Sequence, residues 1–423
     1  MIFDLIEKIA SGIVILVYII SFYYLLISIL GLLIKSRKDN QCSNKNKFAI
    51  VIAAHNEEKV ISNSIKSLNT LNYDKDFYDI FVVADNCTDM TAELSRNEGA
   101  IVYQRFDDKK RGKGYALEWM FNKIFEMEEE SYSAIIVLDA DNIVSPNFLN
   151  EMNIKLNNGH KVIQGYIDSK NPDDNWLTMS YSIAFWSNNR LFQLCRDNLG
   201  LSCQLSGTGF CLEIETLKKI GWGATCLTED LEFTCKLAMN DMRVVLAYKA
   251  VVYDEKPLTL KQSWNQRKRW MQGFADVSSR YFWKLIERFI FHKDFKSLDC
   301  ALYSIQPIVI TILGMVSVFN IGKMMISLFA IFSGHAIGFE FRAIDLMCLA
   351  YFIFQFILTP VMIYLDSKLS LKVFLYYIFI YPFYIVTWVP IAIQGIINKN
   401  KKEWFHTDHS RNVSIKELEK FKN

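Results

Sequence analysis

Asp139 and Asp141 stand one residue apart, directly after the apolar run 134–138. Two carboxylates held this close at the end of a buried strand repel each other unless a cation lies between them. Oxygen ligands of this kind suit Mg²⁺ or Mn²⁺, usually shared with the phosphates of a bound ligand. Alone, the Asp-x-Asp pair is equally consistent with Asp141 capping the following turn.

A glycine-rich basic loop, RGKGYAL, spans 111–117 ahead of a helical pattern. A helix N-terminus that carries a lysine favours an anion, and Lys113 lies between the two glycines of this loop. The spacing differs from that of a phosphate-binding P-loop. A solvated basic loop explains the same residues.

The segment CLTEDLEFTCKL, residues 226–237, places Glu229 and Asp230 just before an amphipathic helical pattern. Asp230 is a candidate general base, which would take the proton of an acceptor hydroxyl. The alternative is structural: Thr228 is the N-cap, and the two acids complement the helix dipole.

The segment QSWNQRKRWMQG, residues 262–273, combines Trp264 and Trp270 with three basic residues, 267–269. Tryptophan faces stack on sugar rings, and arginine clamps diphosphates. An amphipathic helix at a membrane surface, with solvated basic residues and interfacial tryptophans, is the alternative explanation.

The elements that must position these clusters are strands and helices in alternation. Apolar, strand-like runs cover 48–54, 79–84, 100–104 and 134–138. Near-continuous apolar strands between helices predict a parallel sheet covered on both faces. Ligands of such sheets bind beyond the carboxyl ends of the strands, where HNEE, DNCTD, GKG and DADN all fall. The pattern therefore predicts one α/β domain with one site.

Apolar segments flank this domain in a chain of 423 residues that is 51% hydrophobic. Residues 9–34 carry no charge and are long enough to cross a bilayer as a retained helix. Basic residues follow in 35–47, which predicts a cytoplasmic domain. The net charge of +2 gives no indication that the chain binds nucleic acid. The chain has nine cysteines, an odd number, which fits reduced thiols in the cytoplasm.

The C-terminal apolar region predicts several further crossings. Clear spans cover 303–320, 344–365 and 371–397, and 323–339 is weaker. The basic tail after 398 belongs on the cytoplasmic side, which requires an even number of crossings. We therefore expect four, unless the weaker segment is re-entrant or interfacial. The expected units are a transmembrane helix (1–39), a catalytic domain (40–271), amphipathic interface helices (272–300), transmembrane helices (301–398) and a cytoplasmic tail (399–423).

Taken in order, HNEE, DNCTD, GKGYAL, DADN, TED and QRKRW resemble the motifs of family 2 glycosyltransferases. More narrowly, the chain is similar over 1–423 to the membrane-embedded processive synthases of bacterial cellulose, hyaluronan and poly-N-acetylglucosamine. The resemblance implies a cytoplasmic GT-A (Rossmann-like) α/β domain flanked by transmembrane helices. It also implies a UDP-sugar donor, a divalent cation (Mg²⁺ or Mn²⁺), and inversion at the anomeric carbon.

The resemblance also implies roles for individual residues. Asp141 would bind the metal and the diphosphate, and Asp230, beside Glu229, would be the catalytic base. Trp270, Gly207 and Thr208 would contact the acceptor sugar. The implied nucleotide-sugar site consists of Ala54, Glu57, Asp85, Lys113, Asp139, Gln266 and Arg269.

Two stretches depart from the cellulose synthase pattern. In QLSGTG, residues 204–209, Ser206 replaces a cysteine and the preceding aromatic residues are absent, which argues against cellulose itself. The tail motif WFHTDH resembles a gating loop that covers the nucleotide, through Trp404, Thr407 and His409. A disordered, solvated tail is the alternative.

The function we expect is a processive synthase in a bacterial-type plasma membrane that elongates and secretes a β-glycan. The product we expect is a β-glucan made from UDP-glucose, cellulose-like or mixed (1,3;1,4)-linked. Poly-N-acetylglucosamine and hyaluronan synthases remain alternatives, as does a non-processive transferase that glycosylates a membrane lipid. A transporter or assembly subunit with an inert cytoplasmic domain would require intramembrane charges, and the apolar spans carry few.

Overall fold

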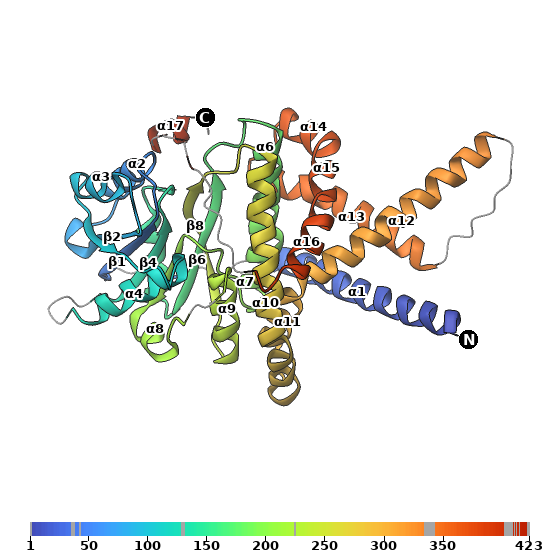
Figure 1. Cartoon of the computed structure of the whole chain (residues 1–423), viewed down its shortest axis with the longest axis horizontal. Coiled ribbons are helices and arrows are strands. Elements are labelled where there is room, and N and C mark those ends of the chain that lie inside the picture. Colours follow the sequence, from blue (N-terminus) through green and yellow to red (C-terminus); the bar gives the residue numbers. More distant parts are fainter. Residues whose placement is uncertain are drawn as a thin grey trace.

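A computed structural model describes residues 2–34, 39–41, 44–127, 132–223, 226–333, 343–401, 409, 411, 413 and 415–420. An eight-stranded sheet lies at one end of the molecule, and two long helices, α1 (Ile2–Leu33) and α12 (Gln306–Phe332), extend from the other (Figure 1). The strand order is β3-β2-β1-β4-β7-β6-β8-β5. The strands are β1 (Phe48–Ala54), β2 (Tyr78–Asp85), β3 (Ile101–Arg105), β4 (Ala134–Asp139), β5 (Ile143–Val144), β6 (Val162–Ser169), β7 (Phe210–Glu213) and β8 (Val244–Asp254).

The half of the sheet that contains β1 to β4 is parallel, which confirms the predicted alternation. β7 pairs antiparallel with both β4 and β6, so the whole sheet is mixed rather than parallel. The local pattern of β7 is only four residues long, so its direction could not be read from the sequence. Because β1, β2 and β4 run in the same direction, their polar ends meet at one edge.

Helices cover both faces of the sheet, and each face has its own hydrophobic core. On one face α2 (Ile61–Asn69) and α5 (Phe148–Asn157) pack through buried aliphatic and aromatic residues. On the other face lie α4 (Lys113–Phe125), α8 (Ile214–Ile220) and α9 (Glu229–Met239). The central strands β1, β2 and β4 are therefore buried on both sides, which explains their near-continuous apolar sequences.

Two helices, α6 (Trp176–Ser187) and α10 (Leu260–His292), join the sheet to the apolar part of the chain. Both begin with a reciprocal capping box: Asn175 with Thr178 starts α6, and Thr259 with Gln262 starts α10. A π-helical segment, 188–194, continues α6, and such distortions often occur at functional sites. α10 carries the Gln266–Trp270 motif within its first three turns.

The C-terminal helices divide the apolar region differently from the predicted spans. α12 runs unbroken through most of 303–320 and 323–332, so two predicted segments form one helix. After α11 (Phe295–Ser304) and α12, the chain continues through α13 (Ala343–Leu365), α14 (Leu371–Phe379), α15 (Tyr381–Val386), α16 (Trp388–Ile397) and the short α17 (Ile415–Lys420). Among the described residues, Ser11–Leu33 is long and apolar enough to cross a membrane. If each of the bent pairs α11–α12 and α14–α16 counts as one span, the number of candidate spans rises to three.

Both ends of the α14–α16 segment contact the catalytic domain. Near its start, Lys372 forms an ion pair with Asp173 at 2.7 Å. Just after its end, the Asn398 carbonyl accepts a hydrogen bond from Gln272 Nε2 of α10 at 3.0 Å. The segment packs on α6 and α10 and runs across the direction of α1 and α12 (Figure 1). The described contacts therefore attach both ends of 371–397 to residues that precede the C-terminal apolar region.

Candidate active site

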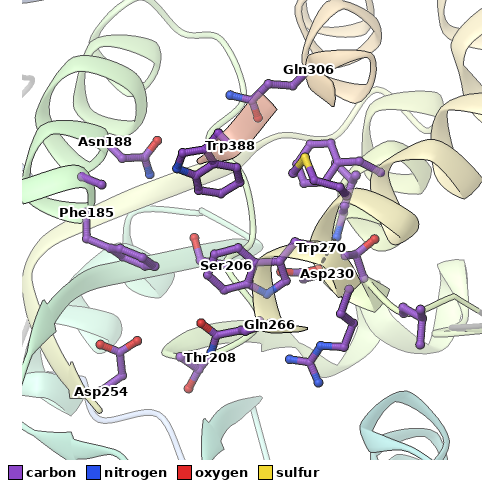
Figure 2. A pocket seen from close by; sticks show the side chains of 18 of the residues that line it. Phe185, Asn188, Ser206, Thr208, Asp230, Asp254, Gln266, Trp270, Gln306 and Trp388 are labelled. Carbon is purple, nitrogen blue, oxygen red and sulfur yellow. Dashed lines mark hydrogen bonds between the residues drawn. The ribbon is translucent and has the colours of Figure 1, made fainter. Parts of the chain in front are cut away.

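A cavity of about 1650 Å³ begins at the carboxyl ends of β1, β2 and β4 and continues between α10, α12 and α16. Asp254, Thr208 and Gln266 lie at one end of the view in Figure 2, Trp388 and Gln306 lie at the other, and Trp270 stands between them. Trp404 and Thr407 lie outside the described residues. All the other predicted site residues line this cavity: Ala54, Glu57, Asp85, Lys113, Asp139, Asp141, Gly207, Thr208, Glu229, Asp230, Gln266, Arg269, Trp270 and His409.

The ends of β1 and β2 are joined by polar contacts. His55, which follows β1, places Nδ1 2.7 Å from the Asp85 carbonyl oxygen at the end of β2. The Asp85 carboxylate forms a buried ion pair with Arg105 of β3 at 2.5 Å. Burial raises the pKa of Asp85, although Arg105 opposes this shift. The Asp85 side chain is thus held rigidly at the rim of the cavity.

Lys113, the first residue of α4, bridges two of the predicted motifs. Its ammonium forms an ion pair with Asp139 and donates a hydrogen bond to the Gly207 carbonyl at 2.8 Å. Burial alone would lower the pKa of Lys113, but Asp139 and Glu229 raise it above its usual value. Gly207 has φ +79°, a conformation that favours glycine, and this turn presents its carbonyl to Lys113.

Thr208 holds the Asp-x-Asp turn in place. Its hydroxyl accepts a hydrogen bond from the Asp139 backbone N–H at 3.0 Å and donates to Asn142 Oδ1. Thr208 is buried, with its hydroxyl already used by the turn. The structure therefore gives Thr208 a positioning role, alongside the acceptor contact that the resemblance implies.

The two aspartates have different surroundings. Asp141 is 4% exposed, and its Oδ2 accepts the Glu255 backbone N–H at 2.8 Å. Lys170 donates to the Asp141 carbonyl at 2.6 Å and lies 3.6 Å from Oδ2. Burial would raise the pKa of Asp141, but His409 and Lys170 hold it below its usual range. Asp141 is therefore an ionised carboxylate inside the cavity.

Hard oxygen ligands at this turn fit a divalent cation. Asp141 is ionised, and the Asp139 side chain remains 37% exposed toward the cavity. Among the described residues, no three His, Cys, Asp or Glu side chains converge closely enough to hold a metal by themselves. A cation here would thus share its coordination with a phosphorylated ligand, which is usual for Mg²⁺.

Glu229 and Asp230 form the first turn of α9 and face the same cavity as Lys113. Burial and the neighbouring Glu229 raise the pKa of Asp230 to about 7, and burial also raises that of Glu229. A carboxyl group with a pKa near neutrality is suited to general base catalysis. Thr228 occupies the N-cap position of α9, as the structural alternative predicted, but its side chain makes no capping hydrogen bond.

The Gln266–Trp270 motif contributes polar atoms that have no partner among the described residues. Gln266 Oε1 and Arg269 Nε are buried without a hydrogen-bond partner there, and both side chains line the cavity. Trp270 stacks on Trp388 of α16, with ring centroids 6.4 Å apart and planes inclined by 24° (Figure 2). The motif thus offers an anion-binding group next to an aromatic surface.

Arg267 does not belong to a solvated basic face. It is fully buried, donates to Thr387 Oγ1 at 2.8 Å, and lies 4.6 Å from the Tyr384 ring centroid. Its long side chain ties α10 to the α14–α16 segment. Helical periodicity could not reveal this, because the partners lie more than 100 residues away.

Sequence reasoning missed a second polar cluster, at the end of β8. Asp254 lines the cavity and pairs with Lys256 at 2.6 Å. Glu255 lies 3.6 Å from Lys170, between the cavity and the C-terminal tail. The signal was present: the acidic pair follows the apolar run 244–253, as DADN follows 134–138.

The C-terminal tail enters the same cavity. His409 Nδ1 lies 3.1 Å from both carboxylate oxygens of Glu57. The Arg411 backbone N–H donates to Glu255 Oε2 at 3.0 Å. Burial would lower the pKa of His409, but Asp141 and Glu57 raise it to about 9. His409 and Arg411 are thus bound to residues of the catalytic domain.

This is the fold and site of a nucleotide-sugar-dependent transferase of GT-A type. Residues 45–273 match the model of the glycosyltransferase-like family 2, and the chain belongs to that family. It is 25% identical over 385 residues to the probable glycosyltransferase YdaM of Bacillus subtilis (strain 168), covering 86% of each chain.

Two other relatives match over 56% of this chain. The β-monoglucosyldiacylglycerol synthase of Nostoc sp. (strain PCC 7120) is 30% identical over 248 residues, 56% of this chain and 51% of that protein. The poly-β-1,6-N-acetyl-D-glucosamine synthase of Staphylococcus epidermidis (strain ATCC 35984) is 25% identical over 244 residues. This match covers 56% of this chain and 57% of that protein. The chain therefore spans little more than half the length of these two.

A solved structure supports the fold over nearly the whole chain. The mannosyltransferase PcManGT of Pyrobaculum calidifontis, in complex with GDP-Man and Mn²⁺, has a TM-score of 0.61. The match covers 94% of this chain and 99% of that one, at 14% sequence identity. At this identity the likeness concerns the fold, including the helices that follow the catalytic domain.

Proposed function

We propose that this protein is a processive, inverting β-glycosyltransferase that uses a UDP-sugar and elongates a β-glycan at a membrane. A β-glucan made from UDP-glucose is the product we favour. The observation that carries the proposal is the continuity of the cavity. One space connects Asp141 and Asp230 to the face of α12 that carries Gln306, Ser317 and Asn320.

The donor half of the cavity suits a nucleoside diphosphate. Asp139 and Asp141 would hold Mg²⁺ or Mn²⁺, which neutralises the leaving diphosphate when bound. Arg269, with its buried and unpartnered Nε, would bind the same phosphates. Ala54 and Asp85, at the ends of β1 and β2, would contact the uridine.

The acceptor half suits a sugar. Asp230 would take the proton from the acceptor hydroxyl as that oxygen attacks the anomeric carbon and the bond to the diphosphate breaks. No covalent intermediate is needed, so the configuration inverts. The stacked pair Trp270 and Trp388 would bind the acceptor ring through its apolar face.

Beyond the acceptor half, one face of α12 lines the cavity with both polar and apolar side chains. Gln306, Ser317 and Asn320 lie on this face, and 14 residues of helix span about 21 Å. Asn320 Nδ2 is buried without a hydrogen-bond partner among the described residues. Unsatisfied amides in an apolar helix mark a polar ligand path, and glycan hydroxyls would satisfy them.

A lipid acceptor is the second candidate. Ile310, Leu313 and Val318 of α12 line the same space and would accommodate an acyl chain. Relatives named β-monoglucosyldiacylglycerol synthase favour this candidate, whereas those named poly-β-1,6-N-acetyl-D-glucosamine synthase favour a polymer.

Product analysis separates the two candidates. Full-length protein in lipid nanodiscs is incubated with Mg²⁺ and one radiolabelled UDP-sugar at a time, and Asp230→Asn serves as the inactive control. A polymer retained at the origin of a chromatogram and degraded by a linkage-specific glucanase supports the processive synthase. Label that moves entirely into a solvent-extractable glycolipid overturns it in favour of a lipid acceptor.

A further inference from the structure

We propose that Asp254 selects the transferred sugar: its carboxylate binds hydroxyl groups of a neutral hexose and excludes a hexuronate donor. The inference rests on the proposed function, because it assumes that a UDP-sugar occupies the cavity. It adds a class of donor sugar to that function. A polymer of the hyaluronan type contains a uronic acid, so this selection excludes it as the product.

The Asp254 carboxylate is held in place through one of its two oxygens. Oδ1 is buried and lies 2.6 Å from Lys256 Nζ. The Lys256 side chain is 2% exposed, and its ammonium lies 3.3 Å from the centroid of the Phe185 ring. A cation over an aromatic face is attracted by the ring. The Asp254 side chain therefore has a fixed partner behind it, and that partner is itself fixed.

The second oxygen of Asp254 faces the cavity. The side chain lines the cavity and is 22% exposed, although Oδ1 is buried. None of the described residues hydrogen-bonds to Oδ2. An ionised carboxylate accepts hydrogen bonds and donates none, so Oδ2 suits the O–H groups of a sugar.

Asp254 lies beside the proposed cation ligand and across the cavity from the proposed base. The next residue, Glu255, donates its backbone N–H to Asp141 Oδ2 at 2.8 Å. In Figure 2, Asp254 and Phe185 lie on one side of the view and Asp230 lies on the other. The donor sugar is joined to the diphosphate that the cation would bind. The transferred sugar therefore belongs next to Asp254.

A fixed carboxylate at this place distinguishes sugars by charge. Hydroxyl groups of a neutral hexose hydrogen-bond to Oδ2, whereas the carboxylate of a hexuronate is repelled, and like charges at a contact strongly disfavour the wrong ligand. Because a pyranose is only one ring wide, the hexuronate carboxylate lies close to Asp254 whichever hydroxyl Asp254 binds. Two lysines of the region are already paired, Lys256 with Asp254 and Lys113 with Asp139.

Calorimetric titration of UDP, UDP-glucose and UDP-glucuronate into full-length protein in lipid nanodiscs with Mg²⁺ tests the selection. Every protein carries Asp230→Asn to limit turnover during the titration. With Asp254 intact, the Kd of UDP-glucuronate should exceed that of UDP-glucose at least about hundredfold. Asp254→Asn should weaken UDP-glucose about tenfold and leave UDP unchanged. The ratio of the two Kd values should fall to about tenfold or less, because Lys256 is then free to attract the uronate.

A second variant covers loss of folding. Asp254→Asn leaves a buried ammonium without its partner, which can destabilise the protein. The double variant Asp254→Asn/Lys256→Met removes both charges at nearly constant side-chain size. The preference for UDP-glucose over UDP-glucuronate should fall in this variant as well.

Asp173→Asn is the matched control. Asp173 also pairs with a lysine, Lys372, but its side chain is 64% exposed and is not among those that line the cavity. The preference should survive there. If UDP-glucuronate binds as tightly as UDP-glucose while Asp254 is intact, or if the preference persists in the folded Asp254 variants, selection by Asp254 is overturned and the donor site stands. Failure of every protein to bind UDP overturns the donor site of the proposed function itself.

Discussion

Gly273 of α10 packs directly on the side chain of Thr228, which precedes α9. A β-carbon at position 273 would lie 2.8 Å from Thr228 Cβ, closer than side chains tolerate. This contact joins the helix that carries Arg269 and Trp270 to the turn that carries Asp230. The glycine thus sets the separation of the proposed phosphate-binding and base residues.

Gly273→Ala should push α10 away from α9 and lower activity even though no chemical group is lost. Overpacking of this kind costs about 1–3 kcal/mol of unfolding free energy. Thermal unfolding and UDP release by the purified variant measure the two effects. Gly12→Ala in α1 is the control, because a β-carbon there meets nothing within 4 Å. If Gly273→Ala and Gly12→Ala unfold at the same temperature and release UDP at the same rate, the packing argument is contradicted.

Asp230→Asn should lower kcat by about 10²–10⁴-fold, the usual contribution of one acid–base group. UDP affinity should barely change, because the base contacts the acceptor. Isothermal titration of UDP and a polymer assay on the same preparation separate the two quantities. If Asp230→Asn still makes polymer at the wild-type rate, Glu229 becomes the first alternative.

The pH profile of the wild type should follow the raised pKa of Asp230. A general base must be deprotonated, so kcat/KM should fall as the pH is lowered through about 7. Glu229 and Asp230 interact, so the measured pKa belongs to the pair. A profile that stays flat from pH 8 to pH 5 would speak against a carboxyl base in this environment.

Chelation should abolish UDP release, and added Mg²⁺ or Mn²⁺ should restore it. Asp141→Asn keeps the size of the side chain but removes its charge, and should cost about 10²–10³-fold in kcat, as for other stabilisers of transition-state charge. Circular dichroism checks that the variant is folded. Full activity in chelator would remove the cation from the reaction.

Trp270→Ala should act on the acceptor and not on the donor. Loss of the stacking face should weaken acceptor binding about tenfold, which corresponds to ~1.4 kcal/mol. Product should become shorter while slow hydrolysis of the UDP-sugar continues. Trp283→Ala is the control, because Trp283 lies on the same helix but is 75% exposed outside the cavity. Comparable product lengths from both variants would rule out a stacking role.

The sequence by itself determined the strands at 48–54, 79–84 and 134–138 and the edge where their polar ends meet. Burial on both faces demands continuous apolar runs, and parallel direction brings their carboxyl ends together. Asp139 and Asp141 lie at that edge for this reason, whereas Asp230, which lines the same cavity, was singled out from the Thr-Glu-Asp stretch ahead of a helix. Gln266 and Trp270 were found through the motif resemblance and line the same cavity.

Only the tertiary structure decided the contacts between distant segments. Arg267 looks like a solvated charge in a helical pattern, yet it is buried against Tyr384 and Thr387. His409 meets Glu57 across 352 residues. Local periodicity reports which side of a helix or strand is apolar. Periodicity does not report which distant segment of the same chain packs against that side, because this depends on how the helices pack after they form.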